Sequence, residues 1–331
     1  MPWLVVRKSD AMTVTFLNPV QTRLQDVEIL MRSQAEGNHP DLVTAIHHLI
    51  QAGGKRVRPA VALLTGGMLG AEPDRLLCLA AAVELLHTAT LVHDDLIDGS
   101  LLRRGSATIN AQWTPAATVL TGDFIFARAA KLAADTGSVT VMQLFAEALT
   151  TIVNGEITQY FRSKGIANRD DYYRRIYAKT ASMFELASEA AAVLSPVDEQ
   201  TVETARRFGY EIGVAFQIVD DVLDFTGEQA RVGKPVGSDL RQGLITLPAL
   251  YYFEANPNDP DMHSVIERNG HNRSQLDRLI DAIRESGAIE LALDEADEYV
   301  QRGLELLEEF PYSPERDTLA DLASYITRRN M

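Results

Sequence analysis

Apolar residues recur at three- and four-residue intervals along almost the whole chain, and this period limits the possible folds more than any other feature. It is clearest in residues 76–96, 116–134, 141–160, 172–194, 201–225 and 291–307. Such spacing puts the apolar side chains on one face of an α-helix. We find no convincing alternating strand pattern and no Asn-Gly or Asp-Gly hairpin between apolar runs. The sequence therefore predicts an all-α fold.

Glycine and proline indicate where these helices end. We expect ends at Gly70, Gly99, Gly137 and Gly165, and before Pro196. Residues 227–239 and 254–273 read as loops, but the composition does not change across them. We therefore predict a single domain over residues 13–331. Residues 1–12 are too short for a signal peptide, and we treat them as a possible N-terminal extension.

Two of the predicted helices contain stretches that are apolar around most of their circumference, residues 76–86 and 148–157. Helices of this kind lie in the middle of a multi-helix bundle rather than on its surface. No stretch has the roughly 18–20 consecutive apolar residues of a membrane span. A bundle with some fully enclosed helices is expected.

The overall charge excludes several classes of partner. A net charge of −15 repels phosphate backbones and anionic lipid surfaces, so nucleic acid is not an expected partner. A phosphate-bearing ligand would need a local basic cluster or bridging cations. The single cysteine excludes an internal disulfide and fits a reducing cytoplasm.

Two segments repeat an Asp-Asp-x-x-Asp pattern at the end of an apolar helix, HDDLID at 93–98 and VDDVLD at 219–224. Aspartates three or four residues apart lie on one helical face, where their charges repel. A shared cation removes that repulsion. One copy alone would read equally well as a solvated helix end, but two copies favour a metal site. Oxygen-only ligands indicate Mg²⁺, held by carboxylates and substrate phosphates. His93 is interpreted as a packing or hydrogen-bonding residue.

Basic residues that could bind phosphate lie near both aspartate motifs. Gly53–Pro59 reads GGKRVRP, and its flexible glycines and cations suit a diphosphate. On the helix that carries the first motif, His87 shares the face of Asp94. Arg103 and Arg104 directly follow the first motif. The second half adds Lys179, Thr180, Gln217 and Lys234, each of which alone reads as a surface residue.

Seven segments together resemble the trans-isoprenyl (polyprenyl) diphosphate synthase family, in the same order and over roughly residues 20–328. They are GGKRVRP, ELLHTATLVHDDLIDGSLLRRG, VLTGDFIFARA, GEITQ, AKTASMF, GVAFQIVDDVLDFTG and GKPVGSDL. The resemblance implies the isoprenoid synthase fold, a multi-helix bundle around a deep central cavity. It also implies a homodimer, with the two aspartate motifs facing each other at the mouth of the cavity. One segment departs from the family pattern, because Leu244 stands where many members have a lysine.

The resemblance also assigns roles to individual residues. Isopentenyl diphosphate would be bound by Lys55, Arg58, His87 and Arg104. Up to three Mg²⁺ ions would be held by Asp94, Asp98 and Asp220, with Asp95, Asp221 and Asp224 in support. The allylic diphosphate would contact Arg103, Lys179, Thr180, Gln217 and Lys234.

The expected reaction needs no protein nucleophile. Cations placed on a leaving diphosphate stabilise the charge that develops as an allylic C–O bond ionises. The double bond of isopentenyl diphosphate then attacks the carbocation. Ala89 and Thr90, just before Asp94, are both small. Because members of the resembled family that stop at short products often have bulky aromatic residues at these positions, the resemblance implies a medium or long product of roughly six to ten isoprene units. The floor of the cavity is expected among Phe124, Phe126 and Phe145, although each also reads as an ordinary core residue.

Other functions fit parts of the pattern. A shorter-chain farnesyl or geranylgeranyl diphosphate synthase would share the motifs. A terpene cyclase would not need the second substrate site at Lys55, Arg58 and His87. A non-catalytic subunit of a heteromeric synthase should have lost carboxylates, yet all six aspartates are present.

Overall fold

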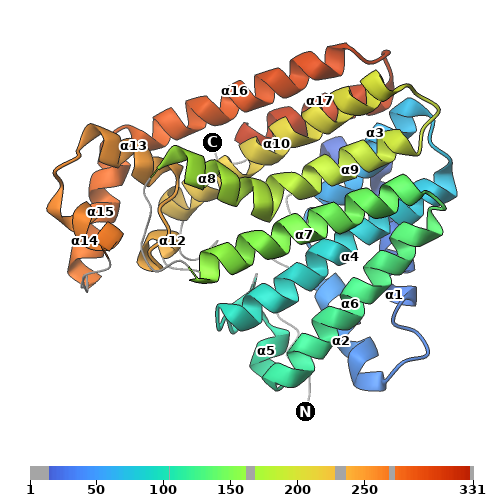
Figure 1. Cartoon of the computed structure of the whole chain (residues 1–331), viewed down its shortest axis with the longest axis horizontal. Coiled ribbons are helices and arrows are strands. Elements are labelled where there is room, and N and C mark those ends of the chain that lie inside the picture. The colour runs from blue at the N-terminus through green and yellow to red at the C-terminus, as the bar shows by residue number, and fades with distance from the viewer. Residues whose placement is uncertain (1–14, 104, 162–167, 228–235, 268–272, 329–331) are drawn as a thin grey trace.

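The computed structural model describes residues 15–103, 105–161, 168–227, 236–267 and 273–328. The predicted N-terminal extension, the helix end at Gly165 and the candidates Arg104 and Lys234 lie outside these ranges. Within them the chain is helical apart from one short hairpin, so the all-α prediction is confirmed (Figure 1).

The first half of the chain builds one side of the bundle. Its elements are η1 (Thr15–Val20), α1 (Gln21–Ser33), α2 (Pro40–Gln51), α3 (Val57–Leu69), α4 (Pro73–Ile97), β1 (Leu102–Arg103), β2 (Ser106–Ala107), α5 (Ile109–Gln112), α6 (Pro115–Asp135) and α7 (Val139–Phe161). The β1–β2 hairpin pairs Leu102 with Ala107. The sequence pattern could not predict this hairpin, because strands of two residues are too short to show alternation.

The second half supplies the remaining helices. They are α8 (Arg169–Ile176), the π-helical turn η2 (Tyr177–Ala181), α9 (Ser182–Val193), α10 (Glu199–Thr226), α12 (Ser238–Arg241), α13 (Leu247–Ala255), α14 (Pro260–Glu267), α15 (Arg273–Glu285), α16 (Ala288–Glu308) and α17 (Pro314–Arg328). The prediction of a loop at 254–273 is wrong in part, since α14 forms there.

Helix α4 lies at the centre of the bundle. It packs against α1, α3, α6 and α9, and its apolar residues from Leu76 to Leu86 face inward on all sides. It is the one described helix long and apolar enough to cross a bilayer, but 67% of that window is buried inside the protein. The prediction that residues 76–86 are enclosed is confirmed.

Helix α7 does not fit the same expectation. The prediction that residues 148–157 lie in the middle of the bundle is wrong, because Val153 and Ile157 are 42% and 49% exposed. The reason is that α7 packs on α6 and α9 by one face only and leaves the other outside (Figure 1).

Glycines at helix ends behave as the sequence predicts. Gly70, Gly99 and Gly137 follow α3, α4 and α6 with positive φ angles of 82°, 64° and 68°. Because these backbone conformations are unfavourable for other residues, glycine ends each helix at a fixed point. Gly99, one residue after the first aspartate motif, thereby ends α4 at that motif.

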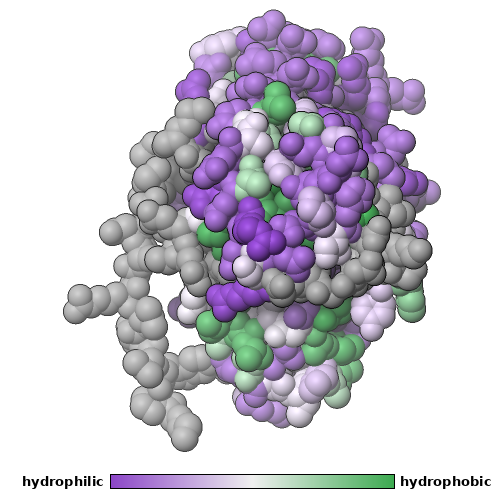
Figure 2. All heavy atoms as spheres, turned by 90° about the vertical axis from the view of Figure 1, so that its left-hand side faces the viewer, coloured by the Kyte–Doolittle hydropathy of each residue, from purple (hydrophilic) through white to green (hydrophobic). Residues whose placement is uncertain are grey.

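Most of the surface on one side of the molecule is hydrophilic. Figure 2 views the side on which α12, α14 and α15 lie and shows polar residues over most of the upper part, with hydrophobic residues gathered lower down. This agrees with the net charge of −15.

Candidate functional site

The two aspartate motifs lie at the C-terminal ends of α4 and α10 and meet at one cavity. The cavity has a volume of about 210 Å³. The described residues that line it are Leu91, Asp94, Asp98, Arg103, Gln159, Arg175, Ile176, Lys179, Gln217, Asp221, Asp239, Leu244 and Thr246. Both motifs therefore contribute carboxylates to one space, although they are more than a hundred residues apart in the sequence.

The three aspartates of the first motif have different surroundings. Asp94 and Asp98 line the cavity. Asp95 is buried and points to Arg103, whose Nε donates to both carboxylate oxygens at 3.0 Å. Arg103 lies on β1, so the short hairpin carries this cation back to the motif. The ion pair indicates that Asp95 holds the hairpin in place, while Asp94 and Asp98 face the cavity.

The second motif shows a similar division. Asp221 is buried yet lines the cavity, and it accepts hydrogen bonds from Tyr172 Oη and Gln217 Nε2, both at 2.8 Å. Asp224 accepts from the backbone N–H groups of Ser238 and Asp239 at the start of α12. Asp220 is half-buried and is not among the described residues that line the cavity.

Two of the predicted polar partners join the second motif through a hydrogen-bond chain. Thr180 Oγ1 donates to Gln217 Oε1 at 2.6 Å, and Gln217 Nε2 in turn donates a hydrogen bond to Asp221 Oδ1. Thr180 lies on the π-helical turn η2, whose wider spacing also presents Lys179 to the cavity. The geometry thus links Thr180 and Gln217 to one aspartate.

Burial and crowding change the acidity of the site. Burial raises the pKa of Asp94 to about 6, with Lys179 acting in the opposite direction and Glu156 and Asp98 in the same one. Burial, and the charge of Asp239, raise the pKa of Asp221 to about 7. A site that raises the pKa of its acids in this way favours cations in the cavity.

Lys179 responds to the same charges. Burial opposes its charged form, but the carboxylates of Asp94 and Glu156 outweigh that effect and raise the pKa of Lys179. Its Nζ lies 3.8 Å from Glu156. Lys179 therefore remains a cation inside an acidic cavity.

A second basic cluster lies at the start of α3. Arg58 Nη1 lies 3.3 Å from His87 Nε2, and its guanidinium stacks on Phe184 at 5.0 Å. Lys55 Nζ donates to Tyr325 on α17 at 2.8 Å. The structure thus brings Arg58 and His87 together. None of the three is among the described residues that line the 210 Å³ cavity.

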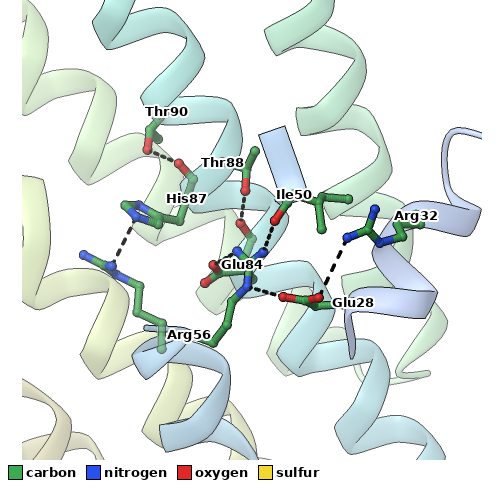
Figure 3. A network of polar contacts seen from close by, with 9 residues as sticks. Glu28, Arg32, Ile50, Arg56, Glu84, His87, Thr88 and Thr90 are labelled. Atoms are coloured by element: carbon green, nitrogen blue, oxygen red, sulfur yellow. Dashed lines mark hydrogen bonds and ion pairs between the residues drawn. The ribbon is translucent and has the colours of Figure 1, made fainter. Parts of the chain in front are cut away.

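The loop that carries this cluster is held by a buried arginine. Arg56 bonds Glu84 at 2.6 Å, Glu28 at 2.9 Å and the carbonyl of Ile50 at 2.7 Å (Figure 3). Its φ of 50° is the one positive value among the described residues other than glycine. Such strain persists only where the surroundings fix it, and here three contacts do so. Arg56, a member of the GGKRVRP motif, is a structural residue.

The residues predicted to control product length are placed as follows. Ala89 is completely buried in the core, and Thr90 is half-buried with its hydroxyl on the carbonyl of His87. Phe145 is also buried, whereas Phe124 and Phe126 are only partly so. The ring of Phe126 packs on His93, whose Nε2 lies 3.2 Å from the carbonyl of Val119. The interpretation of His93 as a packing residue agrees with these contacts.

Sequence reasoning missed several residues that line the cavity. Asp239 and Arg175 are the charged ones, and Gln159 is polar. Arg175 lies four residues before Lys179, so shared helical spacing could have pointed to it. Asp239 comes well after the second motif in the sequence, and no spacing rule connects the two.

The donor chemistry of the cavity fits a hard divalent cation. Its acidic groups are the carboxylates of Asp94, Asp98, Asp221 and Asp239. Carboxylate oxygens are the side-chain ligands that Mg²⁺ prefers. Among the described residues, no three side chains lie close enough to hold a metal ion by themselves. The protein can therefore supply one or two ligands to an ion, with the remainder coming from substrate and water.

Comparisons with known proteins agree with this geometry. Residues 39–283 match the Polyprenyl synthetase family. The chain is 34% identical to the octaprenyl diphosphate synthase of Escherichia coli (strain K12), over 86% of this chain and 88% of that protein. It is 37% identical to heptaprenyl diphosphate synthase component 2 of Geobacillus stearothermophilus, over 93% and 96%.

A solved structure is similar in shape as well. The polyprenyl synthase from Caulobacter crescentus CB15, in complex with calcium and isoprenyl diphosphate, superposes with a TM-score of 0.89 at 36% identity. The similarity covers 98% of this chain and all of the other.

Proposed function

The chain belongs to the polyprenyl synthetase family, and from this premise we propose that it condenses isopentenyl diphosphate with an allylic diphosphate to give a medium- or long-chain trans-polyprenyl diphosphate. One observation carries the proposal. Asp94 and Asp98 from one motif and Asp221 from the other line a single cavity together with Lys179. A diphosphate placed there would meet carboxylate-bound cations from two sides.

The residues of the cavity have separate roles in this reaction. Asp94, Asp98 and Asp221 would hold divalent cations, which would supply positive charge for the leaving diphosphate. Lys179 places a further positive charge on the leaving group, where it stabilises negative charge as it develops. Asp220 and Asp224 support this set, and Asp95 keeps Arg103 in position.

The second substrate is bound at the start of α3. Arg58 and His87 hold the diphosphate of isopentenyl diphosphate, and Lys55 flanks it. His87 and Asp94 are seven residues apart on α4, which corresponds to about 10 Å along the helix. The attacking double bond can then lie between the two diphosphates. The allylic C–O bond breaks, the new C–C bond forms, and the released diphosphate takes the proton.

We also propose that the metal is Mg²⁺ and that the protein acts in the cytoplasm as a homodimer. Val119 and Leu120 of α6 and Val153 and Ile157 of α7 support self-association, because they are exposed apolar residues on two helices that pack against each other. Light scattering should give twice the mass of the chain. Ile157→Lys should shift it toward the monomer, and an unchanged dimer would place the interface elsewhere.

The decisive experiment uses the purified chain alone. Incubation with Mg²⁺, farnesyl diphosphate and isopentenyl diphosphate should yield products of roughly six to ten isoprene units by mass spectrometry. Chelation with EDTA should abolish turnover, and Asp98→Asn should lower kcat at least a hundredfold, since it removes a ligand of the metal. Turnover of farnesyl diphosphate without isopentenyl diphosphate would instead indicate a terpene cyclase.

Inactivity of the chain alone, with activity restored by a second protein, would indicate a catalytic subunit of a heteromeric synthase. The similarity to a protein named as component 2 of a heptaprenyl diphosphate synthase makes this the second candidate.

A further inference from the structure

Three cations line the cavity among the described residues, and they differ in what they contact. Arg103 is paired with the buried carboxylate of Asp95. Lys179 lies near the carboxylate of Glu156. Arg175 donates from Nη2 to the backbone carbonyl of Ile245, which carries no net charge. Within the described part of the chain, no carboxylate forms a direct ion pair with Arg175.

The side chain of Arg175 is also held in a defined orientation. It projects from the last turn of α8, and its guanidinium carbon lies 5.7 Å from the ring centre of the buried Tyr172. The bond to Ile245 ties it to the segment that carries Leu244, another residue lining the cavity. Ring and carbonyl together limit the rotation of a long side chain, so less entropy is lost when an anion binds.

We propose that Arg175 binds the diphosphate of the allylic substrate directly, an assignment that rests on the function proposed above. The four carboxylates of the cavity attract metal ions, and the metal ions attract the diphosphate. A planar guanidinium with five N–H donors matches phosphate oxygens, and only one of its donors is used on Ile245. Arg175 thus contributes a positive charge that forms no direct ion pair with a carboxylate of the described residues.

The position of Arg175 also defines which substrate it serves. It shares the cavity with Asp94, Asp98 and Asp221, whereas Lys55, Arg58 and His87 are not among the described residues lining it. A substitution at Arg175 should therefore selectively weaken binding of the allylic diphosphate. Isopentenyl diphosphate should be almost unaffected.

The test replaces Arg175 with glutamine, which keeps a polar N–H donor but carries no charge. Arg174→Gln is the matched control, because Arg174 is the next residue on the same helix and its side chain is 74% exposed. For Arg175→Gln we expect kcat/KM for farnesyl diphosphate to fall about 10- to 100-fold, the usual effect of losing a hydrogen bond to a charged group. The KM for isopentenyl diphosphate should change less than threefold.

A binding measurement separates this inference from the proposed function. Isothermal titration with inorganic pyrophosphate and Mg²⁺ requires no turnover, and Arg175→Gln should weaken binding about tenfold while Arg174→Gln binds as the parent does. If the parent protein binds pyrophosphate but makes no prenyl product, the proposed function fails and the assignment of an anion-binding arginine still stands. If the parent is active and Arg175→Gln behaves like Arg174→Gln, the inference fails alone.

A second variant tests whether the charge itself is required. Leu244 lines the same cavity next to the carbonyl that Arg175 bonds, so Leu244→Lys places a new cation at the same part of the wall. In the Arg175→Gln background it should recover at least a third of the lost pyrophosphate affinity. Absence of recovery, or an equal loss for both substrates, would mean that Arg175 only supports the 244–246 segment and would overturn the proposal.

Discussion

Glu189 shows how a single residue can make stability depend on pH. It lies on α9 outside the cavity, and burial together with the charge of Glu185 raises its pKa to about 7. The unfolded chain should titrate this carboxyl near 4.5. Between these values the folded protein holds a proton that the unfolded chain has lost, so stability falls as the pH rises from about 4.5 to 7.

Glu189→Gln should remove that dependence. We expect the variant to melt at a higher temperature than the parent at pH 8, where the parent must keep the carboxylate charged, and at the same temperature near pH 4.5. Thermal unfolding at several pH values checks this. Glu203→Gln is the control, because its pKa is lowered by Arg206 and its substitution should not raise stability at pH 8. Equal melting curves for the parent and Glu189→Gln at pH 8 would contradict the prediction.

At this scale the sequence predicted part of the cavity wall. Asp94, Asp98, Lys179 and Gln217 were found because they lie in or near motifs with helical spacing. The spacing could not show that Asp95 turns to Arg103, since neighbouring aspartates on a helix look alike until their partners are known. Tertiary contacts decide which carboxylate faces the ligand.

At the scale of elements, Arg56 connects α1, the end of α2, the start of α3 and α4. Its partners are Glu28, Ile50 and Glu84, and Glu84 lies one turn before His87 (Figure 3). We predict that Arg56→Lys raises the KM for isopentenyl diphosphate about tenfold, because the guanidinium reaches its three partners through three separate nitrogens, which one compact ammonium cannot reproduce, so the segment from Lys55 to Arg58 shifts. The KM for the allylic substrate should stay within threefold.

Steady-state kinetics with each substrate varied in turn provides the measurement. Arg32→Lys is the control, since Arg32 forms only a long 3.9 Å ion pair with Glu28 near the surface. If Arg56→Lys raised the KM of both substrates equally, Arg56 would have no selective role in the site proposed for isopentenyl diphosphate.

Close packing of α10 on α9 gives a prediction about stability. A Cβ atom at Gly209 would lie 2.5 Å from the carbonyl oxygen of Phe184, which is backbone and cannot rotate away. Gly209→Ala should therefore lower the free energy of unfolding by about 1–3 kcal/mol. At Gly67, an exposed position in α3, the nearest atom is a side-chain carbon of Glu315 at 3.4 Å. Gly67→Ala should instead stabilise by about 0.5–1 kcal/mol. Urea unfolding of both variants compares them, and a destabilised Gly67→Ala would contradict the contrast.

The elements themselves were largely predictable, and the exceptions have physical causes. Repeated apolar spacing identified α4, α6, α7, α10 and α16, whose burial is periodic. The short helix α14 and the two-residue hairpin were missed, because elements of so few residues are too short to show a repeating apolar pattern. The exposed face of α7 was also missed, because the pattern of apolar residues along one helix does not show which neighbouring helices cover it.

For the whole molecule, product length depends on how far a growing chain can extend between the central helices. Ala89 lies five residues before Asp94 on α4 and is completely buried. We propose that a growing isoprenoid passes the first motif beside its small side chain. We predict that Ala89→Phe shortens the main product by at least two isoprene units, because the ring fills that space. Mass spectrometry of the reaction products measures the length.

Two further measurements separate a blocked path from a damaged fold. Overpacking a buried position can cost about 1–3 kcal/mol, so the thermal stability of Ala89→Phe must be determined beside its activity. The first condensation should keep at least a third of the parental rate, since the substrates bind above the substitution. Ala89→Ser, which hardly changes the volume, should give the parental product distribution. A folded, active Ala89→Phe with unchanged product length would show that the chain grows along another path through the bundle.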